Sequence, residues 1–145
     1  MADPGRAVTV NVPTITTDAA HRVIAAAEAR AAGIGVPMCI AVADTGGNLK
    51  AFSRMDGAAL LSTQIAQDKA YTAVGFGMPT HGWHDFISGD APLADGAPTG
   101  IDRLIIFGGG YPITVDGAVV GAVGVSGGHY TQDQDVAEAG LAALA

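Results

Sequence analysis

This chain of 145 residues has one cysteine, Cys39, and few cationic side chains. A single cysteine excludes an intrachain disulfide and a thiolate metal cluster. Because Cys39 lies in the apolar run at 38–43, we expect an inert core thiol rather than a nucleophile. Seven lysines and arginines against fourteen acidic residues give a net charge of −7. Such a protein lacks the basic patch that nucleic-acid binding requires, so no nucleic-acid partner is expected.

Long apolar runs and targeting signals are also lacking. The longest apolar runs are far too short to cross a bilayer. The N-terminus shows no basic region followed by an apolar stretch. We therefore expect a cytoplasmic protein with no membrane partner. Apolar residues still make up 49% of the chain, more than a small monomer needs, which suggests that some of them cover a subunit interface.

Hydrophobic periodicity predicts a single α+β domain. Residues 1–13 predict an extended arm, because Val8, Val10 and Val12 alternate with polar neighbours and Pro13 ends the run. Helices are expected from Thr16 or Thr17 to Gly33, over 57–76, and from a capping box at 131–134. Strands are expected over 38–43, 49–54, 103–107, 111–115 and 118–125, the last two joined by an Asp-Gly turn at 116–117. This order predicts an antiparallel sheet of about five strands flanked by helices.

Residues 75–100 interrupt this periodicity with several prolines and glycines. We expect a long loop with one short helical turn near 83–87, and long loops within compact domains often carry function. His81 and His84 would share one face of that turn, with Asp85 beside them. Two histidines at this spacing favour a metal site. The alternative is a solvated loop with aromatic side chains packed beneath it.

Glycines recur through the last third of the chain, and they divide into two groups. Gly121 and Gly124 lie in a predicted strand, where the absence of a side chain favours close packing of a helix. Gly127 and Gly128 come directly before a helix. Their N–H groups and the helix dipole would suit a carboxylate or phosphate. Neither group forms a GxGxxG or P-loop motif, so nucleotide binding is not expected.

Side chains beside this glycine loop are candidates for ligand contact and proton transfer. His129 is either a surface histidine or a general base next to a bound acid. Ser126 completes a GxSxG pattern, but a serine hydrolase would need a parallel sheet and a longer chain.

Three further charged side chains are candidates. Arg54 would pair with Asp56 or clamp a carboxylate, and Asp56 is a natural cap for the second helix. Lys69 is either an ordinary solvated lysine or, if it faces the interior, an anion-binding or catalytic group.

Three segments together resemble the GlcG/HbpS-like family, also known as DUF336 and as the C-terminal part of PduO adenosyltransferases. These are AVADTGGNLKAFSRMDGA (41–58), QDKAYTA (67–73), and GGGYPITVDGAVVGAVGVSGG followed by QDQDVA. The resemblance covers about residues 14–143. It implies a profilin-like α+β fold and a homo-oligomer, often an octamer. Several members bind haem, and others are encoded among genes for degrading small organic acids.

The resemblance extends to particular positions. The residues that match the family pattern are Arg54, Met55, Asp56, Gly57, Lys69, Ala70, Gly109, Pro112, Gly121, Gly124, Ser126, Gly127 and Gly128. His21 falls in the first helix, where the resemblance implies a candidate haem ligand. The segment at 81–100 and His129 depart from the family pattern, so the loop histidines are additional candidates.

Two functions follow as hypotheses. The first is a haem-binding or haem-responsive oligomer with His21, His81 or His84 as the iron ligand. The second is a tautomerase, hydratase or lyase acting on an organic acid. There, Arg54, Ser126, Gly127, Gly128 and His129 would bind the acid, and His129, Lys69 or Asp56 would move the proton. Proton transfer suits this chain better than nicotinamide or flavin chemistry, because no motif for those cofactors occurs. A purely structural or accessory oligomer is the third reading.

Overall fold

A four-stranded antiparallel sheet with the strand order β2-β1-β4-β3 organises the molecule, as shown by a computed structural model that describes residues 4–145. Its strands are β1 (Cys39–Asp44), β2 (Leu49–Arg54), β3 (Gly110–Val115) and β4 (Ala118–Ser126). The central strands β1 and β4 pair along their length, and β2 and β3 form the two edges. The α+β class with an antiparallel sheet is therefore confirmed, with four strands in the described residues rather than about five.

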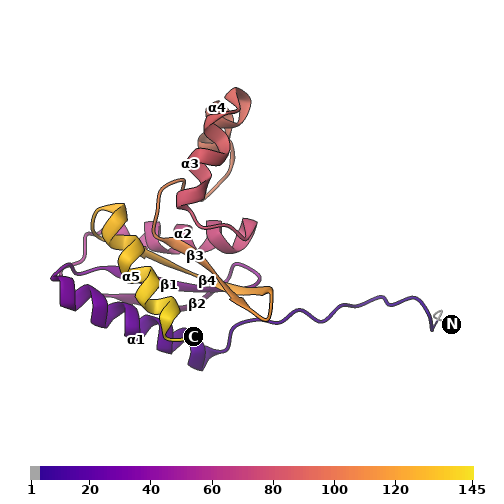
Figure 1. Ribbon diagram of the computed structural model, residues 1–145, viewed down its shortest axis with the longest axis horizontal. Helices are drawn as coiled ribbons and strands as arrows, with labels where there is room; N and C mark the ends of the chain where they lie inside the picture. The colour runs from indigo at the N-terminus through magenta and orange to yellow at the C-terminus, as the bar shows by residue number, and fades with distance from the viewer. Residues whose placement is uncertain (1–3) are drawn as a thin grey trace.

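Three helices cover the two faces of this sheet (Figure 1). α1 (Thr17–Ile34) and α5 (Tyr130–Ala142) pack on one face, and α2 (Ser62–Phe76) packs on the other. Successive side chains of β1 point to opposite faces of the sheet, so this strand contributes to the hydrophobic core on each face. Ile40 and Val42 face α1 and α5, whereas Cys39 and Ala41 face α2. Cys39 is fully buried, as the apolar run predicts.

Two glycines in the sheet allow α2 to lie unusually close to it. Gly110 and Gly124 pair across β3 and β4. A Cβ on Gly124 would collide with the carbonyl oxygen of Ala66, and one on Gly110 would lie 2.6 Å from the carbonyl oxygen of Lys69. The packing role predicted for Gly124 is confirmed, because the backbone of α2 occupies the space that a side chain would need.

Local signals placed several boundaries to within two residues. Thr16 caps α1 by accepting a hydrogen bond from the Ala19 N–H. The helix continues through Gly33, where its end was predicted, and is capped by Gly35 in the left-handed conformation. β3 and β4 are joined at Asp116 and Gly117, which both have positive φ, as a two-residue hairpin turn requires. The capping box lies two residues earlier than predicted, at His129 and Gln132.

The strand predicted over 103–107 is wrong, because this segment joins no sheet. Arg103 has a φ of +64°. The hydroxyl of Thr72 on α2 donates to the Arg103 carbonyl and accepts from the Ile105 N–H, at 2.9 and 3.1 Å. Leu104 and Ile106 of the segment pack against a separate small core around Trp83 and Ile87. A short apolar run does not distinguish these two outcomes.

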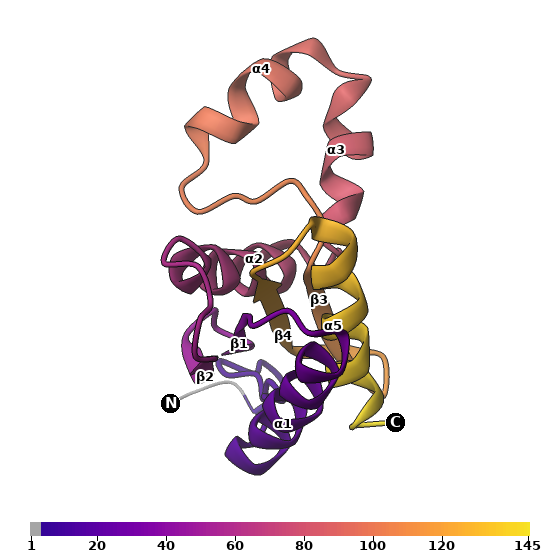
Figure 2. The same cartoon turned by 90° about the vertical axis from the view of Figure 1, so that its left-hand side faces the viewer.

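The loop predicted over 75–100 is largely helical. It forms α3 (His81–Ser88) and α4 (Ala91–Gly100), which project from the body (Figure 2). Asp90 caps α4 by accepting from the Leu93 N–H, and Pro92 stands in the first turn, where a missing N–H costs nothing. Asp90 and Pro92 indicate the start of a helix, although the other prolines and glycines of the segment favoured a loop.

The N-terminal arm extends away from the body (Figure 1). Of the arm predicted at 1–13, residues 1–3 lie outside the described part of the chain. The chain joins the body at Thr14 and Ile15, whose hydroxyl and N–H donate to the Val120 carbonyl. Within the described residues, no helix is both long enough and apolar enough to cross a membrane.

Candidate functional site

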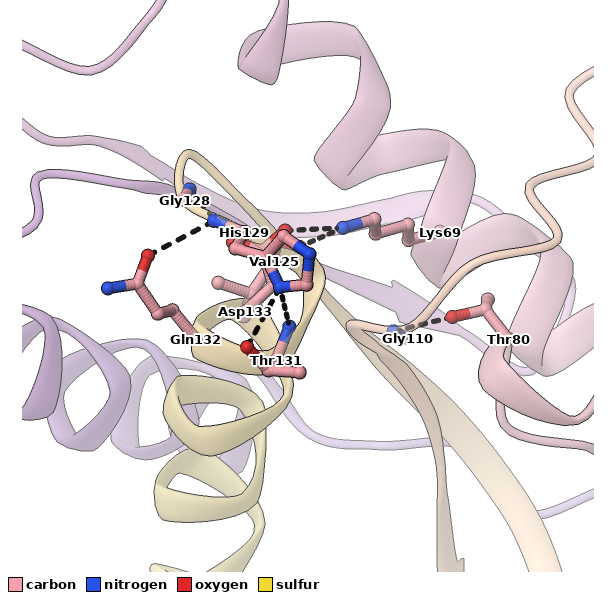
Figure 3. A network of polar contacts seen from close by, with 9 residues as sticks. All are labelled: Lys69, Thr80, Gly110, Val125, Gly128, His129, Thr131, Gln132 and Asp133. Carbon is pink, nitrogen blue, oxygen red and sulfur yellow. Dashed lines mark hydrogen bonds and ion pairs between the residues drawn. The ribbon is translucent and has the colours of Figure 1, made fainter.

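A buried ion pair joins the helices on the two faces of the sheet. Lys69 on α2 places its Nζ 2.7 Å from Asp133 Oδ2 on α5 and donates a second hydrogen bond, of 2.8 Å, to the Val125 carbonyl (Figure 3). The two side chains are 0% and 3% exposed. Asp133 Oδ1 in turn accepts the Gly128 N–H at 3.0 Å. The pair is thus satisfied by backbone groups at the end of β4.

The glycines at 108–110 make room for this pair. A Cβ on Gly109 would lie 2.7 Å from Lys69 Nζ and 2.9 Å from Asp133 Cβ. Gly110 exchanges hydrogen bonds with Thr80, whose hydroxyl accepts the Gly110 N–H at 2.9 Å. These glycines therefore pack against protein atoms and also fix the start of α3.

Burial favours the neutral form of both partners and so shifts their pKa values in opposite directions. Desolvation lowers the pKa of Lys69, and the charge of Asp133 opposes that shift. Desolvation raises the pKa of Asp133, while the Lys69 ammonium and the Gly128 N–H oppose the rise. Each ion is held in place mainly by the other, so removing one leaves the second in an apolar surrounding.

A groove of about 430 Å³ opens next to this pair. Three elements line it: α3, the segment before β3, and the first residue of α5. The lining residues are His81, His84, Asp85, Ile106, Phe107, Gly108 and Tyr130. The Phe107 ring has its centroid 5.1 Å from Lys69 Nζ. Phe107 therefore contacts the buried pair and lines the groove as well.

The two histidines of the groove differ in how firmly they are held. The His81 ring packs edge-on against Tyr111, with 5.5 Å between ring centroids. The Tyr111 hydroxyl donates to Glu138 at 2.8 Å. Burial, together with that bond, raises the pKa of Tyr111 to about 12. His84 is 72% exposed, and its Nδ1 lies 3.9 Å from Asp85. His81 is therefore the better-oriented imidazole.

The sequence made His81 and His84 candidate ligands of a metal ion or of haem iron. The structure brings both side chains into one groove. Within residues 4–145, however, no group of three or more histidine, cysteine or acidic side chains is arranged to hold a metal ion. The arrangement instead suits a ligand that brings most of its own coordination, such as a macrocycle needing one protein imidazole.

One of the N–H groups expected to cradle an anion at Gly127 and Gly128 is used by the protein itself. Gly128 donates to Asp133, and His129 donates to Gln132 at 3.1 Å (Figure 3). A Cβ on Gly127 would lie 2.8 Å from the Pro37 carbonyl, so this glycine also has a packing role. Of the two glycine N–H groups proposed for the anion, that of Gly128 is therefore already paired within the protein.

His129 is the cap of α5 rather than a group poised over a site. Its Nδ1 accepts the Thr131 N–H at 3.3 Å and lies 2.9 Å from the Thr131 hydroxyl. Its ring packs on Tyr130, with 4.1 Å between centroids. The side chain is exposed. His129 therefore has a structural role as the cap of α5.

The other predicted site residues lie apart from the groove. Arg54 and Ser126 are both opposite Cys39, from β2 and β4, so they share one end of the sheet about 10 Å apart. Asp56 is exposed and does not cap α2, which begins at Ser62 after an N-cap without a side-chain bond. His21 is exposed on α1 and is not part of the groove lining.

Asp133, Phe107 and Tyr130 were not predicted as site residues. One signal was available: Lys69 lies on the α2 face made by Ala66, Ala70 and Ala73, so it had to point inward. A buried lysine requires an acidic partner, but the sequence alone does not identify which acid.

The fold has counterparts in known proteins. Residues 15–142 match the family model described as haem degrading protein HbpS-like, so the chain belongs to the HbpS-like family. A relative from Citrobacter freundii, an uncharacterized 15.0 kDa protein in the dhaT-dhaS intergenic region, is 43% identical. That alignment covers 90% of this chain and 92% of the relative. The predicted family membership is confirmed.

Two crystal structures are similar throughout. Klebsiella pneumoniae protein ORFY, a DUF336 protein, shares 38% identity with a TM-score of 0.89, covering 95% of each chain. The PduOC:Heme complex shares 33% identity with a TM-score of 0.82, covering 90% of this chain and 94% of that one. The family therefore includes a member that binds haem.

Proposed function

We propose that this protein binds haem in the groove between α3 and α5, with His81 as the axial iron ligand. The observation that carries the proposal is the shared lining of that groove by His81, His84 and two aromatic rings, Phe107 and Tyr130. The haem bound by a relative of the same fold supports it. Haem supplies redox and diatomic-ligand chemistry when bound, and the protein selects among these through the ligand and its surroundings.

The residues of the groove fit the chemistry of a porphyrin. Imidazole is a common axial ligand, and the apolar faces of Phe107 and Ile106 suit a flat hydrocarbon ring. His81 is oriented by Tyr111, so less side-chain freedom is lost on ligation. No lysine or arginine is among the groove's lining residues. The polar side chains that the groove would offer to the propionates are Tyr130 and His84.

Titration of the purified protein with hemin tests this proposal. We expect a shifted Soret band with the wild-type protein and its loss, or at least a tenfold weaker affinity, in His81→Ala. His21→Ala is the matched control, because this histidine is exposed on α1 outside the groove lining. His84→Ala should change the affinity less than His81→Ala. A spectrum unchanged in His81→Ala but lost in His21→Ala would place the ligand on α1 and contradict the proposal.

A second candidate function is proton transfer on a small organic acid. The observation that favours it is the buried Lys69–Asp133 pair, in which Lys69 contacts the groove residue Phe107. Burial lowers the pKa of Lys69 and raises that of Asp133. Deuterium exchange into a panel of small carboxylic acids, followed by NMR, tests it. Exchange should be lost in Lys69→Arg and retained in His129→Ala, because His129 acts as a helix cap. Equal exchange in both variants would contradict it.

A further inference from the structure

The N-terminal arm carries apolar side chains that its own body does not cover. Val8, Val10 and Val12 are 87%, 82% and 60% exposed. They alternate with Thr9 and Asn11, so in an extended chain the three valines share one side. The arm points away from the rest of the molecule (Figure 1). Three exposed valines on one side of an extended segment match the pattern of a strand whose partner is another surface.

An apolar surface that could contact the valines lies where the arm leaves the body. A groove of about 320 Å³ is lined by Pro13–Thr16, by Ala19 and Arg22 of α1, and by the apolar residues Ile113, Val115, Val120 and Leu144. A second groove, of about 310 Å³, continues along β3 and shares Ile113, Val115 and Leu144 with the first. β3 is an edge strand of the sheet, and Val115 is 49% exposed.

The position of this surface favours a second copy of the same chain as the partner. The base of the arm and the apolar surface of β3 are walls of one groove. Two copies related by a twofold axis near Pro13 would therefore each receive the arm of the other at the same place. Such an arrangement closes on itself, because each protomer both gives and accepts one arm.

The dimensions agree with this arrangement. Residues 7–13 span about 23 Å when extended. β3 has six residues, which correspond to about 20 Å. The arm is thus long enough to lie along the whole of β3. To reach β3 of its own body it would have to reverse direction at Pro13, whereas its observed course continues outward (Figure 1).

We propose that the arm of one protomer packs its valines along β3 of a second copy, and that the second copy returns the same contact. This reciprocal exchange is independent of haem binding. It identifies the segment that joins two chains. It also accounts for part of the apolar excess of the composition.

Sedimentation velocity over a concentration series tests the exchange. We expect Val8→Asp/Val10→Asp to lower the assembly mass at least twofold relative to the wild-type protein. Thr9→Asp/Asn11→Asp adds the same charge to the other side of the arm and should leave the mass unchanged. Circular dichroism of each variant verifies that the body remains folded. A monomeric wild-type protein, or a wild-type mass in Val8→Asp/Val10→Asp, would overturn the proposal, as would the same loss in both variants.

Cross-linking separates exchange from an arm that folds back on its own body. Val10→Cys and Val115→Cys are introduced into separate chains, which are purified and mixed with a bismaleimide reagent. Cys39 is buried and should not react. We expect a covalent product of two chains that requires both variants. If cross-linking occurs only when both cysteines are in the same chain, the arm binds its own body and the proposal is wrong.

Discussion

Lys69 and Asp133 meet at 2.7 Å although α2 and α5 lie on opposite faces of the sheet. They reach each other beside Val125 near the end of β4, just before β3 begins, where Gly109 lacks the side chain that would separate them. The contact links both helical layers to the segment that lines the groove, through Phe107. Stability and the shape of the candidate haem site therefore depend on the same ion pair.

Removing Asp133 should destabilise the protein strongly. Asp133→Ala leaves the Lys69 ammonium buried without a counter-ion, and breaking such a pair costs about 3–5 kcal/mol. Urea unfolding monitored by tryptophan fluorescence measures the loss. Asp135→Ala is the matched control two residues away, because it breaks a half-exposed pair with Arg30 and should cost less than about 1 kcal/mol. Equal losses in the two variants would contradict the buried-pair argument.

A side chain at Gly124 should displace α2. In Gly124→Ala the new Cβ would collide with the Ala66 carbonyl and lie 2.5 Å from the Ala70 nitrogen. Overpacking of this kind costs about 1–3 kcal/mol or more. Gly33→Ala is the control, since nothing lies within 4 Å of that Cβ, and alanine in a helix gains up to about 1 kcal/mol over glycine. Thermal unfolding should move in opposite directions for the two variants.

His129 should prove to be a helix cap. His129→Ala removes the acceptor for the Thr131 N–H and is expected to cost about 1 kcal/mol of stability. His129→Asp should restore it, because a carboxylate is a preferred cap and suits the helix dipole. Chemical unfolding of the three proteins decides this. Failure of His129→Asp to recover stability would show that the imidazole has another role.

Tyr111 should resist ionisation at high pH. Its pKa in the folded state is about 12, compared with 10.0 for an unperturbed tyrosine. The folded protein thus holds this proton more tightly than the unfolded chain. The resulting stabilisation is present in full below pH 10 and is lost as the pH rises toward 12.

Tyrosinate absorbance near 295 nm follows this titration directly. The wild-type protein should show a late-titrating tyrosine that disappears in Tyr111→Phe. Tyr71→Phe serves as the control that keeps the late step. A single transition near pH 10 in the folded wild-type protein would contradict the raised pKa.

Local chemistry explains which parts of the fold were predictable. The cap at Thr16 and the Asp116-Gly117 turn depend on groups within a few residues of each other, and the structure places both where the sequence predicts them. The helix end is at Gly35, two residues after the glycine that was predicted. The strand at 103–107 was predicted wrongly because its partner is the Thr72 hydroxyl, 33 residues away from Ile105. A pattern of apolar residues carries no information about such a partner.

The sequence by itself determined the α+β class, two of the boundary signals and the family. These follow from periodicity, turn chemistry and motif order, which are properties of neighbouring residues. Only the tertiary structure decided that Lys69 pairs with Asp133 and that His81 shares a groove with Phe107 and Tyr130. The reason is physical: burial and sheet topology bring together groups tens of residues apart. Their pKa values and ligand-binding capacity exist only once that contact has formed.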